Sequence, residues 1–520
     1  MKQDRITYLT NILFPCVVFS VVTGILTGGL IFLFRFAASH VEDWASVAYE
    51  WVRHNPLWLG VFLLAAAGLG VLSWIFWKFL PDSRGGGIPT SIGWVRGVLS
   101  FRWIPCLFGT FASSLITYLG GVPLGTEGPS VQMGTAVGKG TVRLLGGRHL
   151  AWDRYVMTGG ASAGFAAATG APLTGILFTF EEAHQRFSPM LLMVSSMTAV
   201  TASITSKGLC SLFGGTWHLF EIPQSQPLPL RYFWAPLLVG IVCGLFALLF
   251  TKVYDWTGSF LSKGKKFPVL LRICLLFCAV ALAGFFFPQS IGSGHDLIEE
   301  VFHGHGIWGI LLVLLLIRSV FLIFANNLGV TGGLFIPSLA FGALIGALCG
   351  RGLIVLGLLP ESYYGVLVIV GMCAFLGASS RIPLMAIAFS MEALSGINNL
   401  MPVILGVCLA YVVMELTGTE DFVDTVLSKK IRHSAKGTPS VVKEEKFIVQ
   451  PHSFVIGKEV RDILWPPRCQ VLSIDRVRAA AHGRTTLAQG DVLHLHYYSD
   501  ETGDAERQLE ALLGHQEKEN

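Results

Sequence analysis

Long apolar segments recur along most of this chain, from about residue 12 to residue 418, and they constrain its fold more than any other feature. A helix that crosses a bilayer needs about 20 apolar residues. The clearest candidates are residues 12–34, 57–80, 234–250, 269–287, 307–324 and 400–416. Charged residues make up only 13% of the chain, about half of the ~25% typical of soluble domains. We therefore expect an all-α polytopic protein embedded in the lipid bilayer.

Charge and cysteine content exclude several other classes. The net charge of +4 is too small to indicate a nucleic-acid partner. The ten cysteines form no zinc pattern, and the closest pair, Cys274 and Cys278, has helical spacing inside an apolar run. Residues 12–34 follow Lys2 and Arg5 as in a signal peptide, but their length favours a first membrane helix. Without a metal cluster or a Ser/His/Asp constellation, we expect neither a cofactor nor an enzyme.

Other apolar segments are broken by Gly and Pro, as in residues 120–138 and 332–350. Broken or re-entrant helices occur at membrane depth only where they line a cavity or pack inside protein. They are also the best pointer in a sequence to a transport site.

The chain repeats itself in its membrane part. Residues 125–138 match residues 333–346 at five positions, with an offset of 208. Matches flank this pair on both sides: Gly85, Gly87 and Gly97 with Gly292, Gly294 and Gly304, and Pro172, Leu173, Ile176, Phe178 and Glu181 with Pro383, Leu384, Ile387, Phe389 and Glu392. We predict two duplicated halves, about 12–215 and 230–430, with a site where they meet. The matches leave open whether the repeats are inverted or parallel.

The composition changes after the last span. Basic residues 429–436 are typical of a cytoplasmic edge, and residues 1–435 form the expected membrane domain. We interpret 436–446 as a linker, 447–503 as a small α+β domain and 504–520 as a polar tail. Within the small domain we expect strands at 447–449, 470–474 and 492–498, and a short helix within 458–464. A domain this small is marginal alone, so it should be docked or dimeric.

Four segments place Gly and Pro beside helix starts: 85–89, 125–129, 170–172 and 333–337. Pro favours the first helical turn, and Gly lets backbone N–H groups approach a ligand. Helix N-termini attract anions through unpaired N–H groups and a partial positive charge. Tight helix packing is the alternative reason for such glycines. The duplication of the motif at helix starts favours the anion site.

Four charged residues in or beside the apolar segments need explanation: Glu127, Glu181, Glu182 and Arg318. Glu127 would compete with an anion for the same N–H groups, and its protonation would release it; the alternative is a structural N-cap. Glu181 and Glu182, near Arg186, are either a solvated interfacial cluster or a proton entry point. Arg318, inside an apolar segment, should satisfy backbone carbonyls or a buried acid rather than bind substrate.

These motifs make the chain resemble the CLC family of chloride channels and chloride/proton antiporters. Residues 85–89, 125–129 and 333–337 stand in the places of the family's G-S-G-I-P, G-[RK]-E-G-P and G-x-F-x-P motifs. The resemblance covers roughly residues 12–430. It implies a homodimer in which each subunit has its own pore, built from two inverted halves of broken helices.

The resemblance also assigns roles to individual residues. Glu127 falls on the external gating glutamate, which accepts protons from outside. Glu182 falls on the internal proton-transfer glutamate, which is typical of antiporters and absent from the family's channels. The resemblance implies that backbone N–H groups line the anion site at Gly86, Gly87, Ile88, Phe335 and Ile336.

Three positions depart from the family pattern. Gly86 replaces a serine that contacts the anion, Thr126 replaces a basic residue, and Val423 stands where a late tyrosine closes the inner side of the central site. Losing both hydroxyls should weaken the central site or widen its inner mouth. Anion selectivity and proton coupling are the properties that these changes affect.

Residues 447 to about 499 are similar to the TrkA-C regulatory domain, on the strength of 453–457, 471–476 and 489–491. This likeness implies regulation by an unknown small ligand or stabilisation of a dimer.

We therefore expect transport of chloride or a similar small anion in exchange for protons, in a bacterial inner membrane with both termini cytoplasmic. A passive voltage- or pH-gated anion channel of the same fold is the nearest alternative. A membrane-anchored sensor acting through its C-terminal domain is another, but a sensor would need only plain spans.

Overall fold

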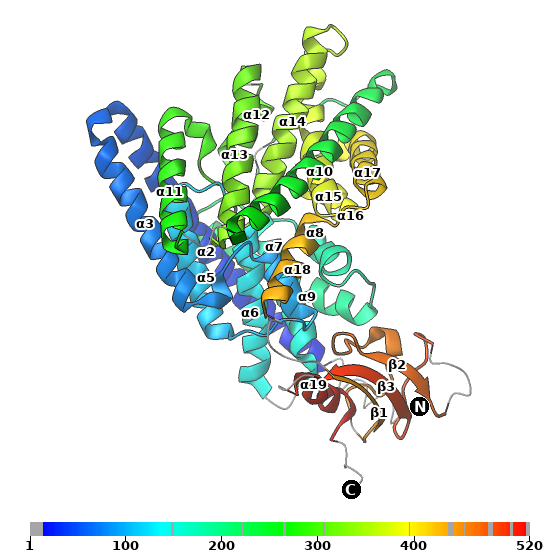
Figure 1. The fold of residues 1–520 in the computed structure, drawn as a ribbon. Helices are drawn as coiled ribbons and strands as arrows, with labels where there is room; N and C mark the ends of the chain where they lie inside the picture. Colours follow the sequence, from blue (N-terminus) through cyan, green and yellow to red (C-terminus); the bar gives the residue numbers. More distant parts are fainter. Residues whose placement is uncertain are drawn as a thin grey trace.

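The structure is a computed structural model, and it describes residues 14–515 except 147–149, 218, 221, 224, 264–266, 305–306, 395, 435–440, 452, 477–481 and 500–502. A large body of helices carries a small three-stranded unit at one end (Figure 1). This arrangement confirms the expected fold class, a helical membrane protein with a small α+β unit.

The first half of the helical body mixes long helices with short ones. Its helices are α2 (Phe14–His54), α3 (Leu59–Phe79), α4 (Ile88–Val95), α5 (Trp103–Leu119), α6 (Glu127–Gly146), α7 (Asp153–Thr169), α8 (Pro172–Phe178) and α9 (Pro189–Phe213). The short helices α4 and α8 carry proline in the first turn, where its missing N–H costs no helical hydrogen bond. They are the broken helices that the Gly/Pro pattern predicts.

The second half repeats this mixture. It contains α10 (Trp234–Lys263), α11 (Val269–Phe286), α12 (His295–Phe302), α13 (Trp308–Leu328), α14 (Phe335–Val355), α15 (Tyr364–Ser379), α16 (Pro383–Ala393), α17 (Leu400–Leu416) and α18 (Phe422–Ser434). The repeat matches make α4, α6 and α8 the counterparts of α12, α14 and α16.

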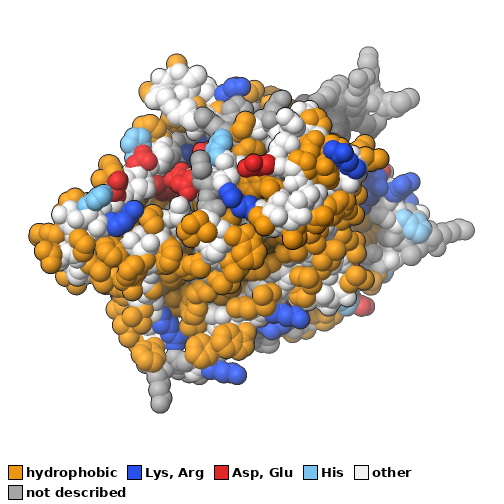
Figure 2. Space-filling model, turned by 90° about the horizontal axis from the view of Figure 1, so that it is seen from above, with side chains coloured by type: hydrophobic (Ala, Val, Ile, Leu, Met, Phe, Trp, Pro, Cys, Tyr) orange, Lys and Arg blue, Asp and Glu red, His pale blue; other side chains and the backbone are white. Residues whose placement is uncertain are grey.

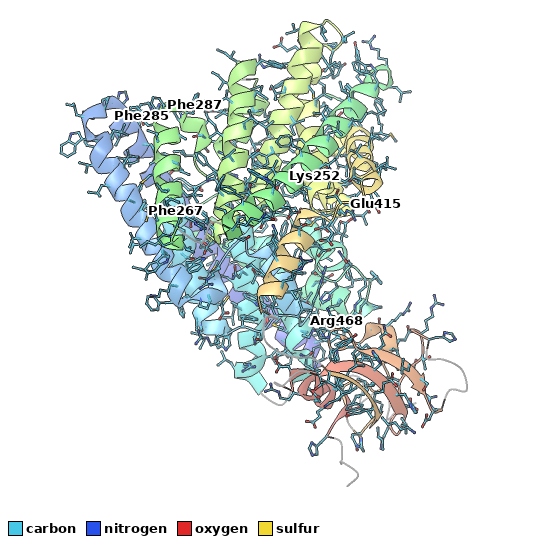
Figure 3. All side chains as sticks on the ribbon, in the orientation of Figure 1. Lys252, Phe267, Phe285, Phe287, Glu415 and Arg468 are labelled. Carbon is cyan, nitrogen blue, oxygen red and sulfur yellow. The ribbon has the colours of Figure 1, made fainter. Side chains whose placement is uncertain are left out.

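The flanks of the helical body are suited to lipid. Nine helical stretches among the described residues are long and apolar enough to cross a membrane. Large apolar side chains such as Leu64, Phe108 and Ile204 are more than two-thirds exposed, and Figure 2 shows hydrophobic side chains over much of the surface. In Figure 3, Phe267 and Phe285 lie near the two ends of α11. A helix of 18 residues is about 27 Å long, close to the ~30 Å thickness of a bilayer core.

The two halves are related by a two-fold axis. The carboxylate of Glu392 accepts a hydrogen bond from the backbone N–H of Leu173 at 2.8 Å, at the start of α8. In return, the carboxylate of Glu181 accepts one from the N–H of Leu384 at 2.8 Å, at the start of α16. Both pairs are equivalent in the repeat, and such an exchange of equivalent partners is the mark of two-fold symmetry. The halves therefore meet as two-fold equivalents, and inverted repeats are the form of this symmetry that the CLC resemblance implies.

The C-terminal unit is an antiparallel sheet covered by one helix. Its strands β1 (Val441–Ile448), β2 (Gln470–Ile474) and β3 (Val492–Ser499) lie in the order β1-β3-β2. Alternate residues of β3 face inward, and they pack with the buried leucines of α19 (Asp504–Leu513).

Three expectations for this region need correction. β1 begins at Val441, inside the range 436–446 that we interpreted as a linker, because its residues pair with β3 along their whole length. The range 504–520 is not only a polar tail, because Leu509 and Leu513 in α19 are fully buried against the sheet. The short helix expected within 458–464 is a single 3-10 turn, Val460–Asp462.

The small unit is docked on the start of α7. Tyr155 donates from its hydroxyl to the carbonyl of Asp462 at 2.6 Å and accepts from the N–H of Leu464 at 3.0 Å. Arg154 donates to the carbonyl of Leu464 at 2.9 Å. The ring of Phe454 packs edge-on against Trp152, with centroids 5.3 Å apart.

Candidate functional site

The starts of α6 and α14 meet in a two-residue backbone bridge. Gly125 donates its N–H to the carbonyl of Gly333 at 2.8 Å, and Gly333 donates back at 2.6 Å. These two glycines are the first residues of the matched segments 125–138 and 333–346. The bridge therefore brings two of the predicted helix-start motifs together, near the two-fold axis.

The first motif joins them through another close backbone contact. Gly87 has φ +78°, a conformation that favours glycine, and a Cβ atom built there would lie 2.1 Å from the carbonyl oxygen of Gly128. A Cβ atom on Gly128 would lie 2.1 Å from the carbonyl oxygen of Gly86. The three motifs at the starts of α4, α6 and α14 thus converge, and the glycines allow this approach.

Glu127 is the first residue of α6 and is completely buried. Its Oε1 accepts a hydrogen bond from the hydroxyl of Thr126 at 3.2 Å. Within the described part of the chain, its Oε2 has no hydrogen-bond partner. The loop that carries it is held by Tyr118, whose hydroxyl donates to the carbonyl of Gly125 at 2.8 Å. A buried carboxyl with one unpaired oxygen is energetically costly, and protonation or movement would relieve that cost.

Backbone donors surround this point. The N–H groups of Phe335 and Ile336 open α14 and have no helical carbonyl four residues earlier. The ring of Phe335 is held edge-on between Phe165 and Phe389, with centroids 4.9 and 5.1 Å away. At the start of α4, the N–H of Ile88 is already bonded to the carbonyl of Gly86 at 3.0 Å. Convergent N–H groups of this kind can hold a small anion without a cationic side chain.

Glu182 lies on the same side of the helical body as the C-terminal unit. It is 6% exposed and sits in a π-helical turn, Thr179–Ala183, that ends α8. Arg96, at the end of α4, donates to the carbonyl of Glu182 at 2.9 Å and forms an ion pair with Asp424 of α18 at 3.3 Å. Because α4 also starts at the Gly87 motif, one short helix links the surroundings of Glu182 to the convergent helix starts. π-Helical turns are frequent at functional sites.

Comparison with known proteins agrees with this geometry. Residues 68–415, about two-thirds of the chain, match the family described as voltage gated chloride channel. The chain belongs to this CLC family. The match spans all three helix-start motifs and Glu182, so the family resemblance drawn from those motifs is confirmed.

Individual relatives resemble most of the chain. It is 28% identical over 430 residues to the H(+)/Cl(-) exchange transporter ClcA of Vibrio parahaemolyticus, covering 81% of this chain and 91% of the relative. It is also 28% identical over 440 residues to ClcA of Salmonella paratyphi B, covering 83% and 90%. Among solved structures, a slow cyanobacterial Cl-/H+ antiporter superimposes with a TM-score of 0.74 at 25% identity, covering 80% of this chain and 98% of that chain.

The three departures from the CLC pattern lie at these places in the structure. Thr126, in place of the motif's basic residue, hydrogen-bonds Glu127. Gly86, in place of serine, is crowded by Asn326 and Leu334, which would lie 3.0 and 3.1 Å from a Cβ atom there. Val423, in place of the late tyrosine, is buried in the first turn of α18.

The remaining charged candidates, Arg318, Glu181 and Arg186, all bond to backbone groups. Arg318 is fully buried and donates to three backbone carbonyls, those of Gln289, Ile291 and Gly292, at 3.0–3.1 Å, as predicted. Glu181 caps α16, so its carboxylate is occupied by backbone N–H groups. Arg186 donates to the carbonyl of Ile463 in the C-terminal unit at 3.4 Å.

A pocket that sequence reasoning missed lies beside Thr126. Its charged side chains and its histidine are Arg35, Glu42, Asp43, His295 and Asp296. Figure 2, which looks down on the face away from the small sheet, shows a group of acidic side chains on that face. These residues come from α2 and α12, which are distant in sequence. No local motif could therefore predict the pocket.

The described residues contain no group of three or more His, Cys, Asp or Glu side chains that could hold a metal ion.

Proposed function

We propose that this chain exchanges chloride or a similar small anion for protons across a membrane. The observation that carries the proposal is Glu127, which is buried at the first residue of α6, where three glycine motifs converge, and has an unpaired Oε2. The names of the ClcA relatives and of the cyanobacterial antiporter support the same activity.

The proposed mechanism follows from competition for the same donors. An ionised Glu127 occupies the electropositive helix starts and excludes the anion. Protonation removes its charge, so the carboxyl leaves and an anion binds to the N–H groups of Phe335, Ile336, Gly86 and Gly87. The proton and the anion are thus coupled at one place, which is the physical basis of exchange.

Glu182 is the proposed proton acceptor on the opposite side. It is buried near the aqueous face that carries the C-terminal unit, and α4 links its surroundings to the helix starts. Two proton-accepting carboxyls on separate faces favour exchange over a passive channel, because a channel needs no inner proton site.

The cellular setting is part of the proposal. We infer a homodimer in a bacterial inner membrane, with both termini and the C-terminal unit in the cytoplasm. The ion pair between Lys429 and Asp255 at 2.9 Å lies near this face, and basic residues at 429–432 agree with the positive-inside rule. Regulation by a small ligand at the C-terminal unit belongs to the same hypothesis.

Flux measurement in liposomes tests the proposed function. The purified protein is reconstituted, a chloride gradient is imposed, and internal pH is followed. Proton movement against its own gradient, driven by chloride, supports exchange. Anion flux without proton movement would instead indicate a channel. Absence of anion flux would contradict both and favour the sensor.

A further inference from the structure

One buried donor near the helix starts is left unpaired. Asn326 lies in the last turn of α13 and is 7% exposed. Its Oδ1 accepts a hydrogen bond from the Tyr254 hydroxyl at 2.9 Å, but its Nδ2 has no partner among the residues that the structure describes. Buried polar groups are nearly always paired, so an unpaired donor points to a bound ion or water.

The amide nitrogen of Asn326 faces Gly86. A Cβ atom built on residue 86 would lie 3.0 Å from Nδ2 and 3.1 Å from Cδ1 of Leu334. Gly86 precedes α4 and Leu334 precedes α14. The unpaired N–H₂ group therefore lies between two of the helix starts that carry the proposed anion donors.

We propose that Asn326 donates a hydrogen bond from Nδ2 to the transported anion beside Gly86. It supplies the side-chain donor that the family's serine supplies in the first motif. This inference rests on the proposed function, and it assigns a further anion ligand, from α13, to the same site.

Gly86 and Asn326 are complementary in space. A serine at position 86 would bring its Cβ to 3.0 Å from the amide nitrogen, which is closer than ordinary van der Waals contact. The two side chains thus compete for one volume, and glycine leaves it to the amide. A neutral amide attracts an anion without a full charge, so binding stays weak enough for release.

Tyr254 is the positioning residue for this amide. Its hydroxyl occupies Oδ1, the acceptor end, so that the donor end points to Gly86. The ring of Tyr254 packs edge-on against Phe422, with centroids 4.7 Å apart, and its backbone carbonyl accepts from Nδ2 of Asn327 at 3.2 Å. Phe422 precedes Val423, so this network lies next to the position where the family's tyrosine is lost.

Titration calorimetry with chloride on the purified full-length protein tests the assignment. Asn326→Ala should raise the chloride Kd by about tenfold to hundredfold, the range expected for a hydrogen bond to a charged partner. Tyr254→Phe should give a smaller rise, because the amide stays but loses its orientation. Asn399→Ala is the matched control: Asn399 is 2% exposed and bonds backbone groups of Leu228 and Gln226. Its chloride Kd should stay at the wild-type value.

A rescue variant separates an anion ligand from a packing role. In the Asn326→Ala background, Gly86→Ser has room for its hydroxyl, so chloride affinity should recover at least in part. An unchanged Kd in Asn326→Ala, or an equal loss in Asn399→Ala, would overturn the inference while wild-type flux upholds the proposed function. Absence of chloride binding and flux in the wild type would overturn both.

Discussion

Gly125 and Gly333, 208 positions apart in the chain, donate backbone hydrogen bonds to each other at 2.8 and 2.6 Å. They occupy the same place in the two repeats, so the contact is one residue meeting its own symmetry equivalent. Neither glycine is part of a helix, and each lies two residues before the first residue of one. This bridge holds the starts of α6 and α14 at the distance at which both can face one small ion.

Substituting Gly333 should separate the helix starts. A Cβ atom there would lie 2.7 Å from the amide nitrogen of Gly128 and 2.8 Å from the carbonyl oxygen of Gly125. Overpacking of this kind costs about 1–3 kcal/mol, so Gly333→Ala should reduce chloride efflux from proteoliposomes by about fivefold or more. Gly352→Ala is the control and should transport normally: Gly352 lies in α14, and no atom lies within 4 Å of a Cβ built there.

Replacing Glu127 with glutamine should uncouple the two fluxes. The amide has nearly the same shape but cannot take up or release a proton, so Glu127→Gln should abolish chloride-driven proton movement and leave anion flux measurable. Paired chloride and pH electrodes check this. Glu361→Gln, on the exposed turn Glu361–Tyr363, should behave like the wild type. Proton transport that survives Glu127→Gln would show that the gate has been assigned to the wrong residue.

Glu182 and its neighbour Glu181 should give opposite phenotypes. Glu182→Gln should stop proton movement while anion flux continues, because the proposed inner proton acceptor is lost. Glu181→Gln should keep coupling, because its carboxylate caps α16 and is bonded to the N–H groups of Leu384 and Met385. The ratio of proton flux to chloride flux, measured for each variant, shows which of the two glutamates transfers the proton. If only Glu181→Gln lost coupling, the proton role would belong to Glu181.

The reciprocal caps should contribute to stability about equally. Glu181→Ala and Glu392→Ala each remove a carboxylate from a helix N-terminus, at an expected cost of about 1–2 kcal/mol. Thermal unfolding in detergent should show similar decreases in midpoint for the two variants. Glu420→Ala, at an exposed position, is the control with no expected change. Clearly unequal decreases would argue against equivalent roles for the two caps.

Docking of the C-terminal unit should strengthen as pH rises. Lys458 is 7% exposed and lies over the ring of Phe454, and its Nζ has no hydrogen-bond partner among the described residues. Burial lowers the pKa of Lys458 well below its ordinary value of 10.5. Between the lowered pKa and about 10.5 the undocked state binds more protons, so docking gains up to about 1.4 kcal/mol per pH unit; below the lowered pKa this gain is absent.

Hydrogen exchange of β1 at several pH values measures this effect. In the wild type, protection relative to Lys458→Met should fall as pH decreases, because the methionine carries no charge to bury. Lys446→Met, in β1 itself, is a control that should keep the wild-type trend. The same trend in wild type and Lys458→Met would rule out Lys458 as its source.

Most of the membrane architecture follows from local patterns. Apolar length predicts spans such as α13 and α17, and Gly/Pro placement predicts the starts of α4, α6 and α14, since these features act over a few neighbouring residues. In the C-terminal unit, local sequence patterns do not predict all of the elements. β1 and α19 look polar in sequence, and they form because β3 and the sheet face are available to them.

The sequence by itself determined the membrane class, the duplication and the CLC family, and it identified Glu127 and Glu182 as candidate site residues. All of these follow from composition or from short motifs. Only the tertiary structure decided which residues from distant parts of the chain lie in contact. It showed that Glu181 caps the other repeat, that α2 and α12 both line the pocket beside Thr126, and that Asn326 points at Gly86. Each of these depends on contacts between residues far apart in the chain, which periodicity and motif spacing do not encode.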